Sequence, residues 1–219
     1  MVNAVIFDMD GVLVDSEPFW QRAEMKIFEE VGLRLTPDDT ASTIGLRIDD
    51  VVAYWYDHSP WSERSLKDVQ NAIIDEVVRL VHAEGQPMPG VRESIDACIE
   101  KGLTLGLATS SPFSLIDAVL ETIDAERSFD VVCSAVNEEF GKPHPAVYLT
   151  AARRLEIEPE SCLVIEDSIF GVEAGKAAGM FVVAVPAPHQ FDDPAFQTAD
   201  RKLRSLESLP RLLDELTAG

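Results

Sequence analysis

Four short polar clusters contain the side chains of this chain that could take part in a reaction. They are Asp8-Met9-Asp10-Gly11, Thr109-Ser110-Ser111, Gly141-Lys142-Pro143 and Glu166-Asp167-Ser168. One such cluster means little, because two carboxylates two residues apart occur by chance in any acidic chain. The set is informative because each cluster follows an apolar segment or precedes a segment with helical spacing. If the apolar segments are buried strands, all four clusters would lie at the same edge of a sheet.

The composition of this set favours phosphoryl transfer. Carboxylates gathered at one edge repel one another by ~4 kcal/mol per pair at about 4 Å and an effective dielectric constant near 20, so they require a divalent cation. Oxygen ligands that leave positions for water and a phosphate favour Mg²⁺ over zinc, whose usual His and Cys ligands are missing. Lys142 and the Thr109 hydroxyl add donors for a phosphoryl group, and a carboxylate can act as the nucleophile.

The elements that must position these clusters alternate along the chain. Short apolar segments typical of buried parallel strands lie at residues 2–7, 103–108, 129–134, 161–165 and 181–185. Segments with helical spacing lie between or beside them, at residues 91–100, 115–123, 146–155 and 169–178. This alternation predicts an α/β fold with a Rossmann-like parallel sheet and helices on both faces, whose chemistry lies beyond the carboxyl ends of the strands.

One long stretch interrupts the alternation. Residues 19–31, 49–56 and 66–81 have the spacing of amphipathic helices, and no buried-strand pattern lies among them. A segment rich in proline and glycine follows at residues 84–90. We therefore expect residues 1–15 and 86–219 to form an α/β catalytic core and residues 16–85 to form a small helical cap inserted after the first strand.

The composition limits the possible partners. The chain has 219 residues, a formal net charge of −21 and 46% hydrophobic residues, so it should fold around a core and repel nucleic acids and anionic membranes. No apolar run could span a bilayer, and no basic region precedes the first apolar stretch. The three cysteines, Cys98, Cys133 and Cys162, should be buried and reduced. We expect a cytoplasmic protein, monomeric or weakly dimeric.

The four clusters, in this order, resemble the motifs of the haloacid-dehalogenase-like (HAD) hydrolase superfamily, and the resemblance extends over the whole chain. The helical insertion looks like the small cap of the branch that includes β-phosphoglucomutases and sugar phosphatases. The segments at residues 15–20, 45–47, 55–56 and 60–61 look most like bacterial phosphatases acting on 2-deoxyglucose 6-phosphate and hexitol phosphates. The resemblance implies a Mg²⁺-dependent phosphatase for small phosphorylated sugars or sugar alcohols.

The resemblance assigns the two reacting carboxylates to Asp8 and Asp10. Asp8 would attack phosphorus and form an aspartyl-phosphate, and its ordinary pKa leaves it ionised at pH 7 without a base. Asp10 would protonate the leaving oxygen and later deprotonate the attacking water, while its backbone carbonyl binds Mg²⁺. The acid role requires a raised pKa, which Asp8 and Glu166 could supply by repulsion.

The resemblance also assigns the groups around them. Thr109, with the backbone N–H of Ser110, would hold the phosphoryl oxygens, and Lys142 would neutralise both nucleophile and phosphate. Asp167 would ligate the metal directly, and Glu166 would orient it through a water molecule.

From the cap, Trp20 and Arg47 are the predicted contacts to the substrate, which we expect to be a small phosphorylated metabolite.

Two alternatives stay open at this point. A β-phosphoglucomutase-like mutase should carry a histidine five residues after the position of Asp15, where this chain has Trp20. A receiver-type signalling domain also combines acidic residues, Mg²⁺, a hydroxyl and a lysine, but it has no place for the Glu166-Asp167 pair or for a cap. Dehalogenation is disfavoured because dehalogenases of this superfamily lack the second aspartate, here Asp10.

The acidity of the site yields a prediction about phosphate binding. Mg²⁺ and Lys142 together would balance three of the four negative charges on Asp8, Asp10, Glu166 and Asp167. Calorimetric titration with inorganic phosphate should therefore show binding weakened by at least about tenfold when EDTA replaces Mg²⁺. Equal affinity in both buffers would contradict the charge argument.

Overall fold

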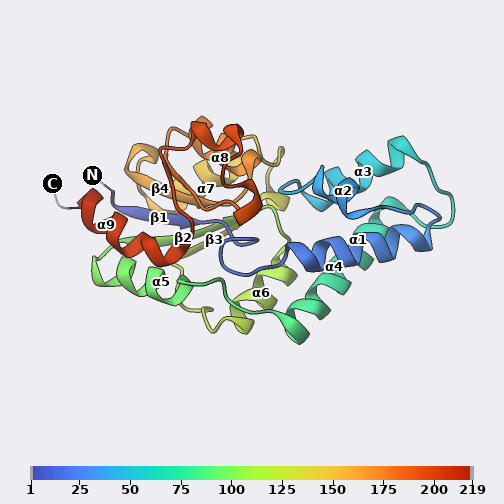
Figure 1. Ribbon diagram of the computed structural model, residues 1–219, viewed down its shortest axis with the longest axis horizontal. Coiled ribbons are helices and arrows are strands. Elements are labelled where there is room, and N and C mark those ends of the chain that lie inside the picture. The colour runs from blue at the N-terminus through green and yellow to red at the C-terminus, as the bar shows by residue number, and fades with distance from the viewer. Residues whose placement is uncertain (1, 218–219) are drawn as a thin grey trace.

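A six-stranded, fully parallel sheet forms the centre of the computed structural model, which describes residues 2–217 (Figure 1). Its strands are β1 (Ala4–Phe7), β2 (Thr104–Thr109), β3 (Val131–Ser134), β4 (Cys162–Glu166), β5 (Phe181–Ala184) and β6 (Arg201–Lys202), in the order β3-β2-β1-β4-β5-β6. The predicted α/β class and five strands are confirmed. The sixth was not predicted because β6 is a two-residue edge strand of charged residues, without an apolar run.

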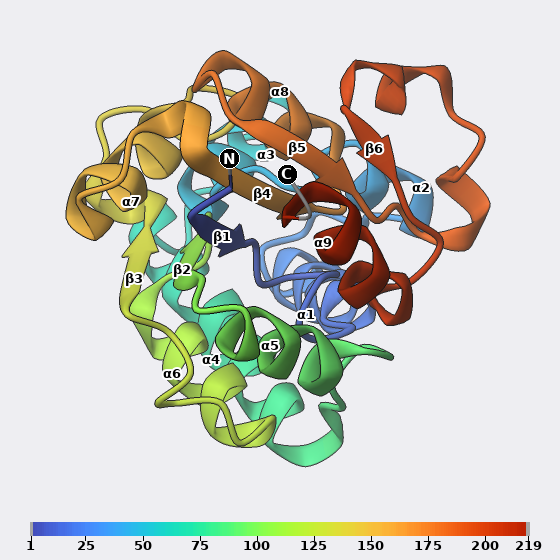
Figure 2. The same cartoon turned by 90° about the vertical axis from the view of Figure 1, so that its left-hand side faces the viewer.

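Two layers of helices cover the sheet (Figure 2). On one face lie α5 (Val91–Glu100), α6 (Phe113–Thr122) and α9 (Leu209–Thr217), and on the other lie α7 (Ala146–Leu155) and α8 (Ile169–Ala177). The side chains of β1 alternate between these layers, so that Val5 and Phe7 join the first and Ala4 and Ile6 the second. Burial on both faces explains why the central strands read as continuous apolar runs.

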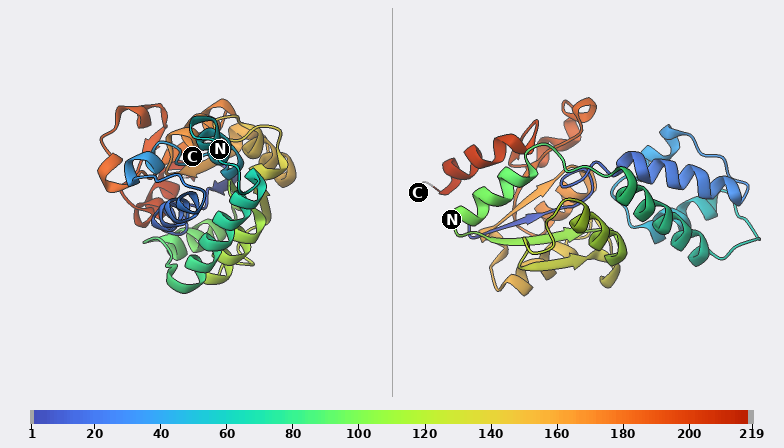
Figure 3. Two further views of the ribbon diagram at one scale, coloured as in Figure 1. Left: turned by 90° about the vertical axis from the view of Figure 1, so that its right-hand side faces the viewer. Right: turned by 90° about the horizontal axis from the view of Figure 1, so that it is seen from below.

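The inserted helices lie beyond the carboxyl ends of the strands, away from α9 (Figures 1 and 3). They are α1 (Glu17–Glu30), α2 (Pro37–Ala41), α3 (Ile48–His58) and α4 (Leu66–Glu84). Their two connections to the sheet run side by side, since Val14 pairs with Pro87 and the N–H of Met88 donates to the carbonyl of Leu13 at 2.9 Å. The short α2, like α9, is additional to the predicted helices.

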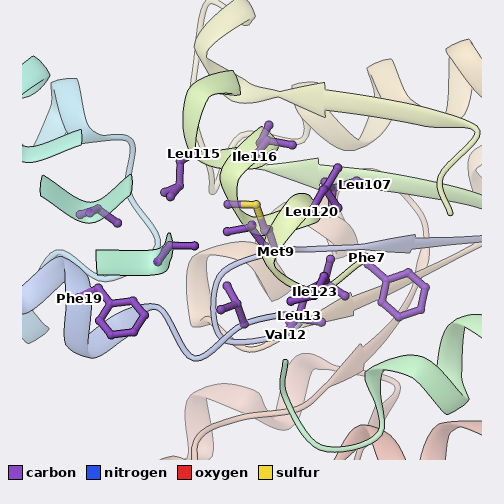
Figure 4. Close-up of a cluster of buried hydrophobic side chains, with 14 of the residues drawn as sticks. Phe7, Met9, Val12, Leu13, Phe19, Leu107, Leu115, Ile116, Leu120 and Ile123 are labelled. Carbon is purple, nitrogen blue, oxygen red and sulfur yellow. The ribbon is translucent and has the colours of Figure 1, made fainter. Parts of the chain in front are cut away.

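A continuous apolar cluster joins the sheet to the inserted helices (Figure 4). It runs from Phe7 through Met9 and Leu13 in the following loop to Phe19 of α1, with side chains of α6 beside it. Met9 and Leu13 are completely buried. Because these apolar residues anchor the loop on both sides, the polar residues between them are held at the carboxyl end of β1.

Two expectations from composition can be compared with the structure. The three cysteines, Cys98, Cys133 and Cys162, are buried and free, as predicted. None of the helices within residues 2–217 is long and apolar enough to cross a membrane.

Candidate active site

The buried ammonium group of Lys142 lies between two carboxylates from neighbouring strands. Its Nζ is 2.8 Å from Asp8 Oδ1 and 2.6 Å from Glu166 Oε1. Asp8 directly follows β1 and Glu166 ends β4, and the N–H of Asp8 donates to the carbonyl of Ile165 at 2.9 Å. Pairing of these two strands therefore brings together acidic residues that are far apart in the sequence, and Lys142 enters between them from the loop before α7.

Burial and neighbouring charges change the pKa values of Asp8 and Lys142. Burial, followed by repulsion from Glu166, raises the pKa of Asp8 from 3.8 to about 7, while Lys142 acts in the opposite direction. Burial alone would lower the pKa of Lys142, but attraction to Asp8 and Glu166 outweighs it and raises that pKa. The ordinary pKa from which the ionisation of Asp8 was expected therefore does not apply in this environment. The charge of Asp8 depends on Lys142 and on further positive charge.

Protein donors occupy both oxygens of Glu166. Oε1 accepts hydrogen bonds from Lys142 and from the Tyr148 hydroxyl at 2.6 and 2.5 Å. Oε2 accepts them from the backbone N–H groups of Asp167 and Ser168, both at 3.1 Å, and from the Ser168 hydroxyl at 3.0 Å. Five donors exceed the roughly four lone-pair positions of a carboxylate. Glu166 therefore has little capacity left for a direct metal bond, in line with the indirect role expected for it.

Tyr148 was not predicted as a site residue. Burial and the charge of Glu166 raise its pKa, so the phenol keeps the proton that it donates to Glu166. A tyrosine on the apolar face of a helix reads as a core residue in the sequence. Only the packing of α7 on the sheet brings its hydroxyl group to a carboxylate.

Three carboxylates form a candidate metal centre. Ligand oxygens of Asp8, Glu166 and Asp167 lie within 4.8 Å of one another, close enough to hold one ion. Burial, then repulsion from Glu166 and from Asp8, raises the pKa of Asp167. Gly11 leaves space for the carboxylate of Asp167. Its φ is +70°, and a Cβ at this position would lie 1.9 Å from Asp167 Oδ2. An all-oxygen donor set of this kind suits a hard divalent cation.

The carboxylate of Asp10 lies outside that cluster and connects the sheet to the inserted helices. Oδ1 accepts hydrogen bonds from the hydroxyl of Ser16 at 2.5 Å and the indole N–H of Trp20 at 3.0 Å. Oδ2 accepts them from the hydroxyls of Ser111 at 2.7 Å and Thr109 at 3.3 Å. Neither serine was assigned a role from the sequence, although Ser111 belongs to the Thr109-Ser110-Ser111 cluster. Four donors from two segments, residues 16–20 and 109–111, fix the position of this carboxylate.

A single cavity between the sheet edge and the inserted helices, about 60 Å³ in volume, connects most of the predicted site residues. Those that line it are Asp8, Asp10, Trp20, Thr109, Ser110, Lys142 and Asp167. Part of its wall is a contact between the two parts of the chain, where the Ser110 hydroxyl donates to the carbonyl of Gly45 at 3.1 Å. Glu166 lies beneath the cavity, behind Lys142 and Tyr148.

Arg47, which was predicted to contact the substrate, does not line this cavity. Its guanidinium is paired with Asp49 and Asp50, both at 3.2 Å, in the first turn of α3. It also donates to the backbone carbonyls of Ala135 at 3.3 Å and Glu138 at 3.0 Å, in the segment after β3. The contact expected between Arg47 and the substrate stays a prediction, and in this structure carboxylates and backbone carbonyls hold the guanidinium.

Two further acidic residues on α1, which the sequence analysis did not single out, line the cavity. Glu24 is only 6% exposed, and its Oε2 has no hydrogen-bond partner among the described residues. Burial, then repulsion from Glu17, raises the pKa of Glu24 to about 8. Burial also raises the pKa of Glu17 to about 7, although a hydrogen bond from Gln21 opposes the shift.

The parallel sheet, the carboxylates at its edge and the helical insertion define a class of α/β enzymes whose chemistry depends on acidic residues. The chain belongs to the haloacid dehalogenase-like hydrolase family, whose model matches residues 5–185. This membership confirms the resemblance seen in the four clusters, and it rules out the receiver-type alternative.

Individual proteins are similar over nearly the whole chain. Hexitol phosphatase B of Escherichia coli (strain K12) is 44% identical over 209 residues, which cover 95% of this chain and 94% of that protein. A Thermotoga maritima protein described as a phosphorylated carbohydrates phosphatase is 35% identical and covers 82% of each chain. The crystal structure of CbbY from Rhodobacter sphaeroides in complex with phosphate has a TM-score of 0.87 at 26% identity, covering 95% of this chain and 96% of that one.

The raised pKa of Glu24 predicts how stability depends on pH. The native state keeps this proton up to about pH 8, whereas the unfolded chain releases it near pH 4.5, so wild-type stability falls as pH rises between these values. Gln cannot titrate. The Glu24→Gln variant should therefore gain stability relative to wild type by roughly 2 kcal/mol or more between pH 5 and pH 8, at about 1.4 kcal/mol per pKa unit.

Urea unfolding at a series of pH values measures this difference. Glu29→Gln is the matched control, since Glu29 lies on the same helix but is exposed. Its stability should follow that of wild type at every pH. Parallel curves for wild type and Glu24→Gln would show that the environment of Glu24 is not as described.

Proposed function

We propose that this phosphoric monoester hydrolase removes phosphate from small phosphorylated sugars or sugar alcohols, such as hexitol phosphates or 2-deoxyglucose 6-phosphate. The observation that carries the proposal is the Asp8–Lys142 pair, a carboxylate and an ammonium group 2.8 Å apart that both line an enclosed cavity. The two phosphatases similar to this chain, described as acting on hexitol phosphates and phosphorylated carbohydrates, support the choice of substrate class.

In the proposed reaction, Asp8 supplies the nucleophile. A carboxylate oxygen of Asp8 forms a bond to phosphorus while the bond from phosphorus to the sugar oxygen breaks, which leaves an aspartyl-phosphate. Lys142 offsets negative charge on both partners. The Thr109 hydroxyl and the backbone N–H of Ser110 hold phosphoryl oxygens. Such positioning and charge compensation supply most of the stabilisation in phosphoryl transfer.

Asp10 acts as the general acid and base in this scheme. It gives a proton to the departing sugar oxygen and then takes one from the water that hydrolyses the aspartyl-phosphate. The hydrogen bonds from Ser16, Trp20 and Ser111 hold its carboxylate in place at the cavity wall. Because Trp20 belongs to α1, this position depends on how the inserted helices sit on the sheet.

The donor set fits Mg²⁺ as the cofactor. Asp8, Asp167 and the backbone carbonyl of Asp10 are the proposed ligands, with Glu166 acting through a water molecule. Bound there, Mg²⁺ would supply positive charge to the phosphate oxygens. The proximity of carboxylate oxygens of Asp8, Glu166 and Asp167, all within 4.8 Å of one another, supports this assignment.

We propose that residues 1–15 and 86–219 act as the catalytic core and residues 16–85 as a cap that closes over the leaving group. The paired connections at Val14 and Pro87 provide the hinge. The cavity between the two parts, about 60 Å³ in volume, suits a small molecule, and cap movement would admit the substrate and exclude water during the reaction. A cytoplasmic location and a monomeric or weakly dimeric state stay predictions.

Hydrolysis is favoured over mutase activity by the cavity lining. A mutase must hold a second phosphate on the sugar, yet Lys142 is the one cation that lines the cavity within the described residues. Arg47, the cation expected from the cap, is directed elsewhere. Incubation with a hexose 1-phosphate and a trace of bisphosphate separates the two activities, because a mutase conserves organic phosphate and a phosphatase releases it.

Replacing the nucleophile tests the reaction itself. Asp8→Asn retains the shape of the side chain but removes the attacking carboxylate, so phosphate release from a hexitol phosphate with Mg²⁺ should fall by at least about 10⁴-fold. A malachite green assay measures the release, and circular dichroism checks that the variant is folded. Activity close to that of wild type would refute the assignment of Asp8.

Replacing Trp20 tests its connection to Asp10. Trp20→Phe removes the N–H donor and keeps an aromatic ring in the cap, so kcat should fall by about tenfold with a smaller change in KM. A change confined to KM would instead indicate that Trp20 only contacts the substrate.

A further inference from the structure

A second group of polar side chains faces the cavity from the cap side. Glu17, Gln21 and Glu24 lie three or four residues apart on α1 and so share one helix face. Thr40 and Thr43, in and just after α2, line the same cavity. The proposed phosphoryl-transfer steps use none of these residues, although all of them lie opposite the reacting carboxylates.

Glu24 is the member of this group that most needs an explanation. Its side chain is buried, yet Oε2 has no hydrogen-bond partner among the described residues. Buried polar atoms of folded proteins nearly always have a partner, and each exception requires a reason. No described cation on this side of the cavity could pair with it, since Lys142 is bound to Asp8 and Glu166. A partner for Glu24 must therefore arrive with a ligand.

The neighbouring threonines indicate which hydrogen-bonding groups that ligand should carry. The hydroxyl of Thr40 donates to the carbonyl of Pro37 at 3.0 Å, and that of Thr43 donates to the carbonyl of Thr40 at 3.1 Å. Because each hydroxyl has one proton, both oxygens can only accept hydrogen bonds from the cavity. The threonine oxygens therefore offer acceptors, and the carboxyl of Glu24, which keeps its proton below about pH 8, offers one donor and further acceptor positions. This wall suits a ligand whose hydroxyl groups both donate and accept hydrogen bonds, and it holds no cation for a negatively charged group.

We propose that Glu24, with Thr40 and Thr43, forms a hydroxyl-recognition subsite that selects phosphate monoesters with a neutral, polyhydroxylated leaving group and disfavours esters with a second phosphate. The inference rests on the proposed function and specifies its leaving group. A sugar or sugar alcohol supplies hydroxyl groups that both donate and accept hydrogen bonds, whereas a second phosphate would enter a space without a cation. A site built to bond hydroxyls discriminates strongly against molecules without them.

The test compares Glu24→Gln and Glu24→Met with the exposed control Glu29→Gln. The substrates are glucitol 6-phosphate, fructose 1,6-bisphosphate and p-nitrophenyl phosphate, whose leaving group has no aliphatic hydroxyl. For Glu24→Met, kcat/KM should fall by about 10- to 100-fold with glucitol 6-phosphate but by less than about threefold with p-nitrophenyl phosphate. For this variant, the ratio of kcat/KM with glucitol 6-phosphate to kcat/KM with fructose 1,6-bisphosphate should fall as well. Glu24→Gln should show a smaller loss, because an amide still offers an acceptor.

A binding measurement that needs no turnover separates this proposal from the proposed function. In the Asp8→Asn background, Glu24→Met should weaken calorimetric binding of glucitol 6-phosphate by about tenfold and leave binding of inorganic phosphate unchanged. If Glu24→Met weakens binding of glucitol 6-phosphate but the wild type releases no phosphate, the subsite would be supported and the phosphatase assignment refuted. Phosphate release with equal losses on all three substrates, or with none, would refute the subsite alone.

Discussion

The placement of one buried ammonium group between two carboxylates is the constraint on which the site depends. Lys142 contacts Asp8 and Glu166 at 2.8 and 2.6 Å in a region that solvent hardly reaches. A buried ion pair is tolerated only when its geometry is good and the remaining hydrogen-bonding capacity is filled. Here Tyr148 and Ser168 complete the hydrogen bonds of Glu166. The pairing of β1 with β4 and the packing of α7 must therefore form together for the charges to be compensated.

A second set of hydrogen bonds connects the reacting groups to the inserted helices. Trp20 of α1 donates to Asp10, and Ser110 of the core donates to the carbonyl of Gly45. On the outer side, Arg47 reaches backbone carbonyls after β3. These contacts bridge the sheet edge and the cap at several points around the cavity. The position of the proposed general acid is thereby coupled to the position of the cap.

The strong negative charge of the chain is compatible with an anionic substrate because the cations are distributed unevenly. Basic side chains of the inserted helices form ion pairs away from the cavity, as in Arg22 with Glu84, Lys26 with Glu76 and Arg64 with Glu30. Lys142 lies beside Asp8 in the lining of the cavity. Positive charge is thus available next to the proposed nucleophile, on the side of the cavity that the sheet edge forms.

The sequence by itself determined the alternating strands and helices, the insertion after β1 and the clusters that meet at the sheet edge. These features depend on short-range patterns. A buried parallel strand must be apolar, and the polar residues of a site at the sheet edge come directly after the carboxyl ends of such strands. Only the tertiary structure decided that Tyr148 bonds Glu166, that Arg47 is held outside the cavity and that Glu24 is buried without a partner. Helical spacing indicates which way a residue faces, but its partner comes from another segment and is set by how the two pack together.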